Sequence, residues 1–143
     1  MQPNPTQPPE YGAPITLTVA KRVMQAAEAE AEANQWPMVI AILDSGGHLV
    51  MFHKRDHAQL GSIHVAQRKA ETALSFKRPT KMLEDLLAGG GVAWRLLTPG
   101  NVCAMEGGIP LFVDGKIVGA IGVSGMQSGQ DAQVAAAGAK ALA

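Results

Sequence analysis

The densest group of reactive side chains is the run Lys54-Arg-Asp-His57, which directly follows an apolar stretch. Arg55 could hold a carboxylate through two parallel hydrogen bonds. His57 could move a proton or ligate iron, because imidazole changes protonation near neutral pH. A solvated turn is the alternative, with an Arg55–Asp56 pair worth at most about 1 kcal/mol. The run therefore gives three candidate binding residues, Arg55, Asp56 and His57.

Two other segments carry candidates. Lys69 follows Ala66 in an alanine-rich run, and its long stem could reach a bound anion or extend into solvent. Glu106-Gly107-Gly108 precedes a strand-like stretch, where paired glycines let backbone N–H groups face a ligand. Glu106 could act there as a general base, so Glu106 and His57 are the candidate catalytic residues. A plain glycine bend is the alternative.

The histidines do not form a recognisable metal motif. His53, His57 and His64 are close in the sequence, but they fall on a predicted strand end, a loop and a helix. Their spacings of 4 and 7 would share a face only on one helix. We therefore predict no dedicated metal site.

Composition narrows the class of protein. The chain has 143 residues, which suits one domain, and 12 basic against 12 acidic residues give a formal net charge of 0. Neutrality argues against nucleic acid or an acidic membrane surface as the main partner. The sequence shows no apolar stretch long enough to span a membrane and no signal-peptide pattern. Cys103 is the single cysteine, so no intrachain disulfide can form. We therefore expect a cytoplasmic location. Only 2 Trp, 1 Tyr and 3 Phe are present, so smaller aliphatic side chains must fill the core. Because each of these buries little area, we expect the chain to gain further burial as a homo-oligomer.

The candidate residues need elements to position them, and the hydrophobic pattern supplies these. We expect a helix capped by Thr16 or Thr18 and stopped by Pro37, a hairpin of 38–44 and 48–53, helices over 60–76 and 79–87, a hairpin of 109–113 and 116–124, and a final helix capped by Asp131. This helix–hairpin–helix–helix–hairpin–helix order predicts an α+β fold: a single antiparallel sheet of about five strands flanked by helices, as in profilin. Residues 1–14 contain five prolines and are expected to be a disordered tail before a domain over 15–143.

An ordered set of short motifs resembles the GlcG/HbpS haem-binding family, which includes the C-terminal domain of PduO-type proteins. The residues that carry the resemblance are Ile15-Thr-Leu17, Val39 to Asp44 with Gly46-Gly47, Arg55-Asp56 with Ala58, Ala66 with Lys69-Ala70-Glu-Thr-Ala73, Gly107-Gly-Ile-Pro110, Asp114-Gly115, Gly119-Ala-Ile-Gly-Val-Ser-Gly125 and Gln130-Asp131. The resemblance implies the same element order, assembly into dimers or larger rings, and binding of haem or a related tetrapyrrole.

One branch of that family places a histidine ligand on the first helix, where this chain offers only Met24 as a soft donor. Among its histidines, His57 is therefore the favoured haem ligand. We expect one pocket lined by Arg55-Asp56-His57, Lys69 and Glu106-Gly107-Gly108, closed in part by a second subunit. Haem propionates or a metabolite carboxylate would match Arg55 and Lys69. The alternative function is an isomerase or lyase acting on a carboxylated metabolite.

Overall fold

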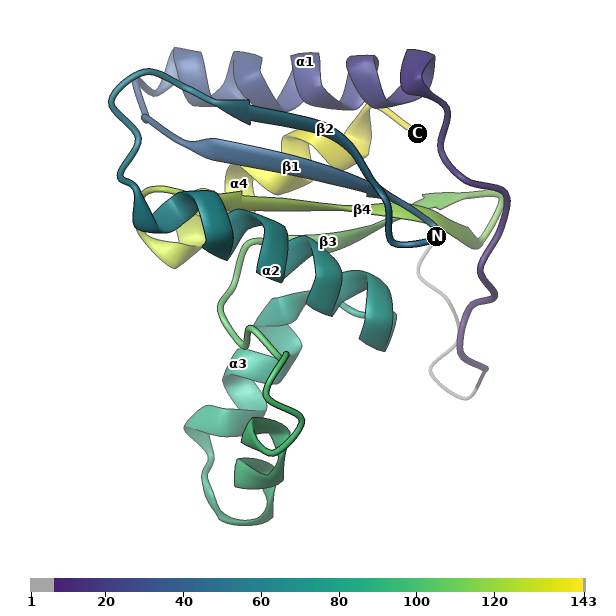
Figure 1. Ribbon diagram of the computed structural model, residues 1–143, viewed down its shortest axis with the longest axis vertical. Coiled ribbons are helices and arrows are strands. Elements are labelled where there is room, and N and C mark those ends of the chain that lie inside the picture. The colour runs from purple at the N-terminus through teal and green to yellow at the C-terminus, as the bar shows by residue number, and fades with distance from the viewer. Residues whose placement is uncertain (1–6, 143) are drawn as a thin grey trace.

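The structure is a computed structural model that describes residues 7–142. The elements, in chain order, are α1 (Leu17–Ala33), β1 (Val39–Asp44), β2 (Leu49–Lys54), α2 (Gly61–Phe76), α3 (Thr80–Ala88), the 3-10 helix η1 (Gly91–Leu97), β3 (Gly108–Val113), β4 (Lys116–Ser124) and α4 (Ser128–Lys140). Figure 1 shows the sheet between two layers of helices, with α3 projecting away from both.

The expected α+β class with one antiparallel sheet is confirmed. The sheet has four strands in the order β2-β1-β4-β3, so the expectation of about five strands was wrong for the described residues. The two hairpins supply all four strands, and the N-terminal segment contributes only an isolated bridge between Tyr11 and Ile117. The likeness to profilin stays a prediction, because the element order alone does not establish it.

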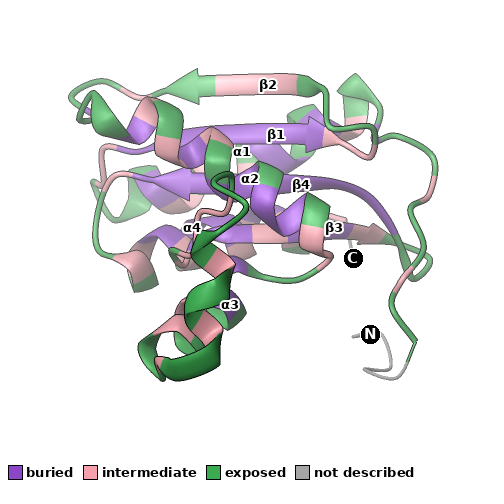
Figure 2. Cartoon of the chain, turned by 60° about the horizontal axis from the view of Figure 1, so that its bottom comes forward, coloured by how far each residue is buried: buried purple, intermediate pink, exposed green. Residues whose placement is uncertain are grey.

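Both faces of the sheet are covered. α1 and α4 pack on the face that carries Ile40, Ile42 and Ile121, whereas α2 packs on the face that carries Leu43 and Ala120. The residues of β1 are buried in an almost unbroken run, as expected for a strand between two helical layers. β2 lies at an edge and is only partly covered, which Figure 2 shows beside the buried β1. This half-covered edge is where a groove can form.

Part of the expected tail is attached to the sheet. The Gly12 N–H donates to the Ile117 carbonyl at 2.8 Å, and the Ile117 N–H donates to the Glu10 carbonyl at 2.9 Å. The Tyr11 hydroxyl donates to the Leu74 carbonyl at 2.7 Å. β4 extends past the end of β1 there, so its backbone groups need other partners. The described residues 10–12 thus do not form a disordered tail, and residues 1–6 lie outside the described part.

α3 and η1 form an arm (residues 80–97) that stands away from the sheet (Figures 1 and 2). Leu83 anchors the arm in the core at 2% exposure, whereas five other large apolar side chains of the arm are half or more exposed: Met82, Leu86, Val92, Trp94 and Leu97. No helix in the described range 7–142 is long and apolar enough to cross a membrane.

Candidate functional site

A groove of about 480 Å³ runs between α1 and the edge strand β2. Its lining residues are Lys21, Met24, Gln25, Glu28, Ala29, Glu32, Met51, His53 and Arg55. The helical members recur at spacings of three and four, which places them on one face of α1. Met51 and His53 alternate along β2, and Arg55 follows its last residue in the same alternation, which points the three side chains to the same side of the sheet. The periodicity of the helix and that of the strand therefore place these side chains on the two facing surfaces of the groove.

Glu28 is the centre of a polar cluster at one side of this groove. Its Oε1 lies 2.7 Å from His53 Nδ1, and its Oε2 accepts from Arg55 Nη1 at 2.9 Å. The Arg55 guanidinium also contacts the Glu32 carboxylate. Arg55 is mostly buried, whereas Glu32 is 73% exposed and free to move into solvent. The cluster holds the imidazole and the guanidinium at fixed positions beside the groove.

The rest of the groove is apolar at the bottom and cationic at the rim. Met24 is buried, Met51 is half-buried, and Ala29 adds a small exposed side chain. Lys21 is exposed on the first part of the same helix face. Within residues 7–142, no three His, Cys, Asp or Glu side chains gather in a way that could hold a metal ion by themselves. The groove is thus suited to a flat, partly apolar ligand, and its charged lining consists of two cations, Lys21 and Arg55, and two carboxylates, Glu28 and Glu32.

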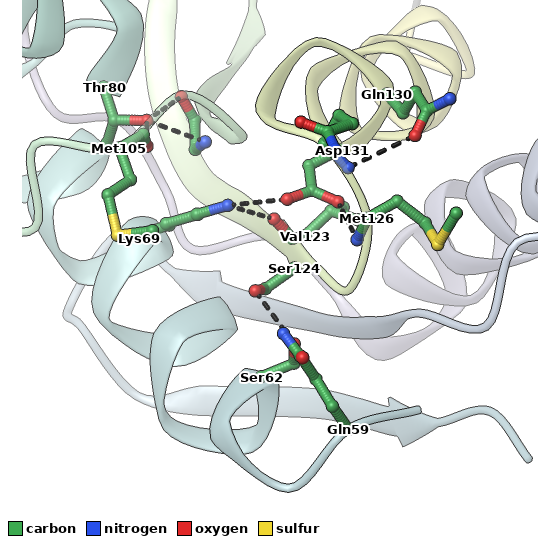
Figure 3. A network of polar contacts seen from close by, with 12 residues as sticks. Gln59, Ser62, Lys69, Thr80, Met105, Val123, Ser124, Met126, Gln130 and Asp131 are labelled. Atoms are coloured by element: carbon green, nitrogen blue, oxygen red, sulfur yellow. Dashed lines mark hydrogen bonds and ion pairs between the residues drawn. The ribbon is translucent and has the colours of Figure 1, made fainter. Parts of the chain in front are cut away.

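Lys69 lies on α2, the helix on the sheet face opposite α1, and its side chain enters a buried network that reaches α4 (Figure 3). Its Nζ donates to Asp131 Oδ2 at 3.0 Å and to the Val123 carbonyl at 2.9 Å. The lysine side chain is 1% exposed and that of Asp131 is 4% exposed. Burial raises the pKa of the Asp131 carboxyl, while the Met126 N–H and the Lys69 ammonium act in the opposite direction. Lys69 thus joins α2 to the end of β4 and the first turn of α4.

Asp131 also corrects an expectation about α4. The helix begins at Ser128 with Gln127 as its N-cap, in a capping box with Gln130. Asp131 lies in the first turn and accepts the Met126 N–H at 2.9 Å through Oδ1. The prediction that Asp131 caps the helix was therefore wrong, because its carboxylate turns back toward Met126 and Lys69.

The glycine bend lies next to Lys69 but is closely packed. A Cβ on Gly108 would lie 2.4 Å from the Lys69 carbonyl oxygen, and one on Gly107 would lie 2.6 Å from the Val123 carbonyl oxygen. The Gly108 N–H donates to Thr80 Oγ1 at 2.9 Å, so it already has a partner. Glu106 is mostly buried, and its Oε1 lies 3.9 Å from Lys81 Nζ.

The seven predicted binding residues therefore lie at the same end of the sheet, but they do not line one common pocket within a single chain. Lys54 at the end of β2 and Ser124 at the end of β4 both pair with Val39, which puts the loop after β2 and the glycine bend at the same end. Arg55 turns to α1, and Asp56 and His57 are exposed, with His57 in the left-handed region at φ +70°. A pocket shared by all seven would need closure by a second subunit, so that pocket stays a prediction.

The groove residues Lys21, Glu28, Glu32 and His53 were not among the sequence-based candidates. The signal was present in two parts: a polar stripe at positions 21, 25, 28 and 32 on the first helix, and the alternation of positions 51, 53 and 55 along and just after the edge strand. Only the packing of α1 over β2 joins these parts. Arg55 is the one predicted residue that lines this groove.

Comparison with known proteins agrees with this architecture. The family described as "Haem degrading protein HbpS-like" matches residues 15–140. Protein GlcG of Escherichia coli strain K12 is 40% identical over 110 residues, covering 77% of this chain and 81% of GlcG. The crystal structure of a PduOC:heme complex superposes with a TM-score of 0.84 at 29% identity, covering 90% of this chain and 95% of that one. The crystal structure of HbpS also gives a TM-score of 0.84, at 32% identity and 92% coverage of both chains. This chain is therefore a member of the HbpS-like family.

Proposed function

We propose that this protein binds haem or a closely related tetrapyrrole in the groove between α1 and β2. The observation that carries the proposal is the set of side chains around one groove: an apolar floor, an imidazole held by a carboxylate, and two cations, with a second carboxylate at the exposed rim. A relative of the same fold has been crystallised as a heme complex, which supports the choice of ligand.

The groove residues fit the chemistry of haem. A volume of about 480 Å³ lies within the range of small-molecule sites, roughly 300–1,000 Å³. From Lys21 to Glu32 the helix face extends roughly 16 Å, calculated from a rise of about 1.5 Å per residue. Ala29 and Met51 would contact the porphyrin plane, while Lys21 and Arg55 would hold its carboxylates. Haem bound here would supply an iron centre whose reactivity depends on its axial donor and surroundings.

Arg55 would position the ligand by replacing one of its own partners. The guanidinium contacts Glu28 and Glu32, and the exposed Glu32 side chain can turn away without uncovering a buried group. The freed N–H donors could then bind a propionate, while the pair with Glu28 keeps the guanidinium in place. This exchange would orient the propionate edge toward the end of β2.

Titration with ferric haem tests the proposal. We expect the full chain to shift and sharpen the Soret band with saturation, and Arg55→Ala to weaken binding about tenfold, the equivalent of about 1.4 kcal/mol. Arg22→Ala is the matched control, because Arg22 is exposed on the same helix but does not line the groove. Absence of a saturable Soret change, or equal losses in both variants, would contradict binding in this groove.

We also propose that copies of this chain associate through the arm of α3 and η1. Trp94 is 65% exposed and Val92 is 77% exposed, on a segment that projects away from the sheet. Burying such side chains against a second copy would remove a large apolar area from water.

Light scattering should therefore show a dimer or larger species at micromolar concentration. Trp94→Asp should lower the mass toward that of one chain, because it places a charge in the apolar contact. Leu60→Asp is the control, since Leu60 is 79% exposed but lies outside the arm. A monomeric parent protein would exclude self-association, and an unchanged mass for Trp94→Asp would exclude the arm.

A further inference from the structure

We propose that His53 is the axial ligand of the bound iron through Nε2, and that Glu28 is its positioning residue. This inference rests on the proposed haem binding and adds the identity of the donor. It replaces the sequence-based preference for His57.

The protonation pattern of His53 follows from its partner. Glu28 Oε1 lies 2.7 Å from Nδ1, and an ionised carboxylate only accepts hydrogen bonds. In a neutral ring this contact places the hydrogen on Nδ1 and the lone pair on Nε2, the nitrogen that can bind a metal. Histidines that bind metals commonly have their second nitrogen held by a carboxylate in this way.

Glu28 is itself held in place. Its second oxygen accepts from Arg55 Nη1 at 2.9 Å, so both oxygens have partners and the carboxylate has little freedom to turn. The His53 side chain is 45% exposed, which leaves the ring accessible from the groove. The donor thus combines a fixed orientation with an open face.

Three other candidate donors, Met24, His64 and His57, are less suitable. The Met24 side chain is in the core, at 1% exposure, with its thioether packed away from solvent. His64 is exposed on α2, which covers the other face of the sheet, and His57 has no carboxylate contact recorded within residues 7–142.

His48 provides an internal control. Its Nδ1 lies 3.2 Å from Asp44 Oδ1, so it also has a carboxylate partner. It lies in the turn between β1 and β2, outside the groove, and its side chain is 81% exposed. A carboxylate partner is therefore not sufficient for haem ligation. His53 differs from His48 because it also lines an apolar groove that could hold the porphyrin.

Spectra of ferric haem complexes test the assignment. The parent chain and His48→Ala should give the same histidine-type Soret and visible bands. His53→Ala should lose those bands and bind haem 10- to 100-fold more weakly, and added imidazole should restore the bands. Glu28→Ala should weaken haem binding 10- to 100-fold, whereas Glu28→Gln should keep more of the affinity, because its amide oxygen still accepts from Nδ1.

Iron-free protoporphyrin separates ligation from the groove itself. Since it has no iron to ligate, His53→Ala should bind it as tightly as the parent chain does. If the parent binds haem but His53→Ala leaves the spectrum unchanged, or if His57→Ala alone changes it, the assignment of His53 is overturned while haem binding stands. If the parent binds neither haem nor protoporphyrin, the proposed function itself fails. Equal losses of haem and protoporphyrin by His53→Ala would also overturn the ligand role, because they indicate damage to the groove.

Discussion

Replacing Lys69 by methionine should lower the free energy of unfolding by about 3–5 kcal/mol, a loss of roughly 10–17 °C in melting temperature for a domain of this size. Methionine keeps most of the apolar stem, so packing changes little. The variant removes the ammonium that bonds Asp131 and the Val123 carbonyl in a region from which water is excluded. It leaves a buried carboxylate without its counter-charge, and that uncompensated charge is the source of the expected loss.

Chemical denaturation can compare this variant with a surface pair on the same chain. Lys81 and Asp85 form an i, i+4 pair at 3.2 Å, with side chains 52% and 63% exposed. Lys81→Met should cost less than about 1 kcal/mol, because water solvates the remaining carboxylate. The double variant Lys69→Met with Asp131→Asn should lose less than the sum of the single variants, since no lone charge stays buried. Equal losses for Lys69→Met and Lys81→Met would show that the Lys69 pair is not buried in solution.

The position of Lys69 shows where reasoning from the sequence stops. The alanines around it indicate a helix that packs closely, and the structure has that helix. Its partner, however, is 62 positions away, and no local pattern pairs the two. A lysine in an apolar run can extend into solvent, bind a ligand or pair internally, and only the tertiary structure distinguishes these outcomes.

The groove, too, could be predicted only in part from the sequence. Periodicity predicts that Met51, His53 and Arg55 share one face of a strand and that Glu28 lies on the polar side of a helix. It does not show that this polar side is laid over the strand, because 25 positions separate Glu28 from His53. Local elements and fold class were therefore predictable, whereas the pairing of His53 with Glu28 depends on how α1 crosses the edge of the sheet.

One added methyl group at the contact between α2 and the sheet should lower the free energy of unfolding about as much as the loss of the Lys69 charge does. Gly108 and Gly122 are paired across β3 and β4. A Cβ on Gly122 would lie 2.0 Å from the Ala66 carbonyl oxygen and 2.6 Å from the Ala70 backbone nitrogen. The helix backbone thus rests directly on the strand, which is possible only because neither residue of the pair has a side chain.

Gly122→Ala should therefore destabilise the protein by about 3 kcal/mol or more, since backbone atoms of both elements must separate to make room. Gly61→Ala is the matched control at the first residue of the same helix, where a Cβ would meet nothing within 4 Å. That change should be neutral or stabilise by up to about 1 kcal/mol, because alanine favours helix more than glycine does. Thermal melts of both variants measure the difference directly. Similar melting temperatures for the two would mean that α2 does not approach β4 this closely, and the account of the glycine bend as a packing feature would then fail with it.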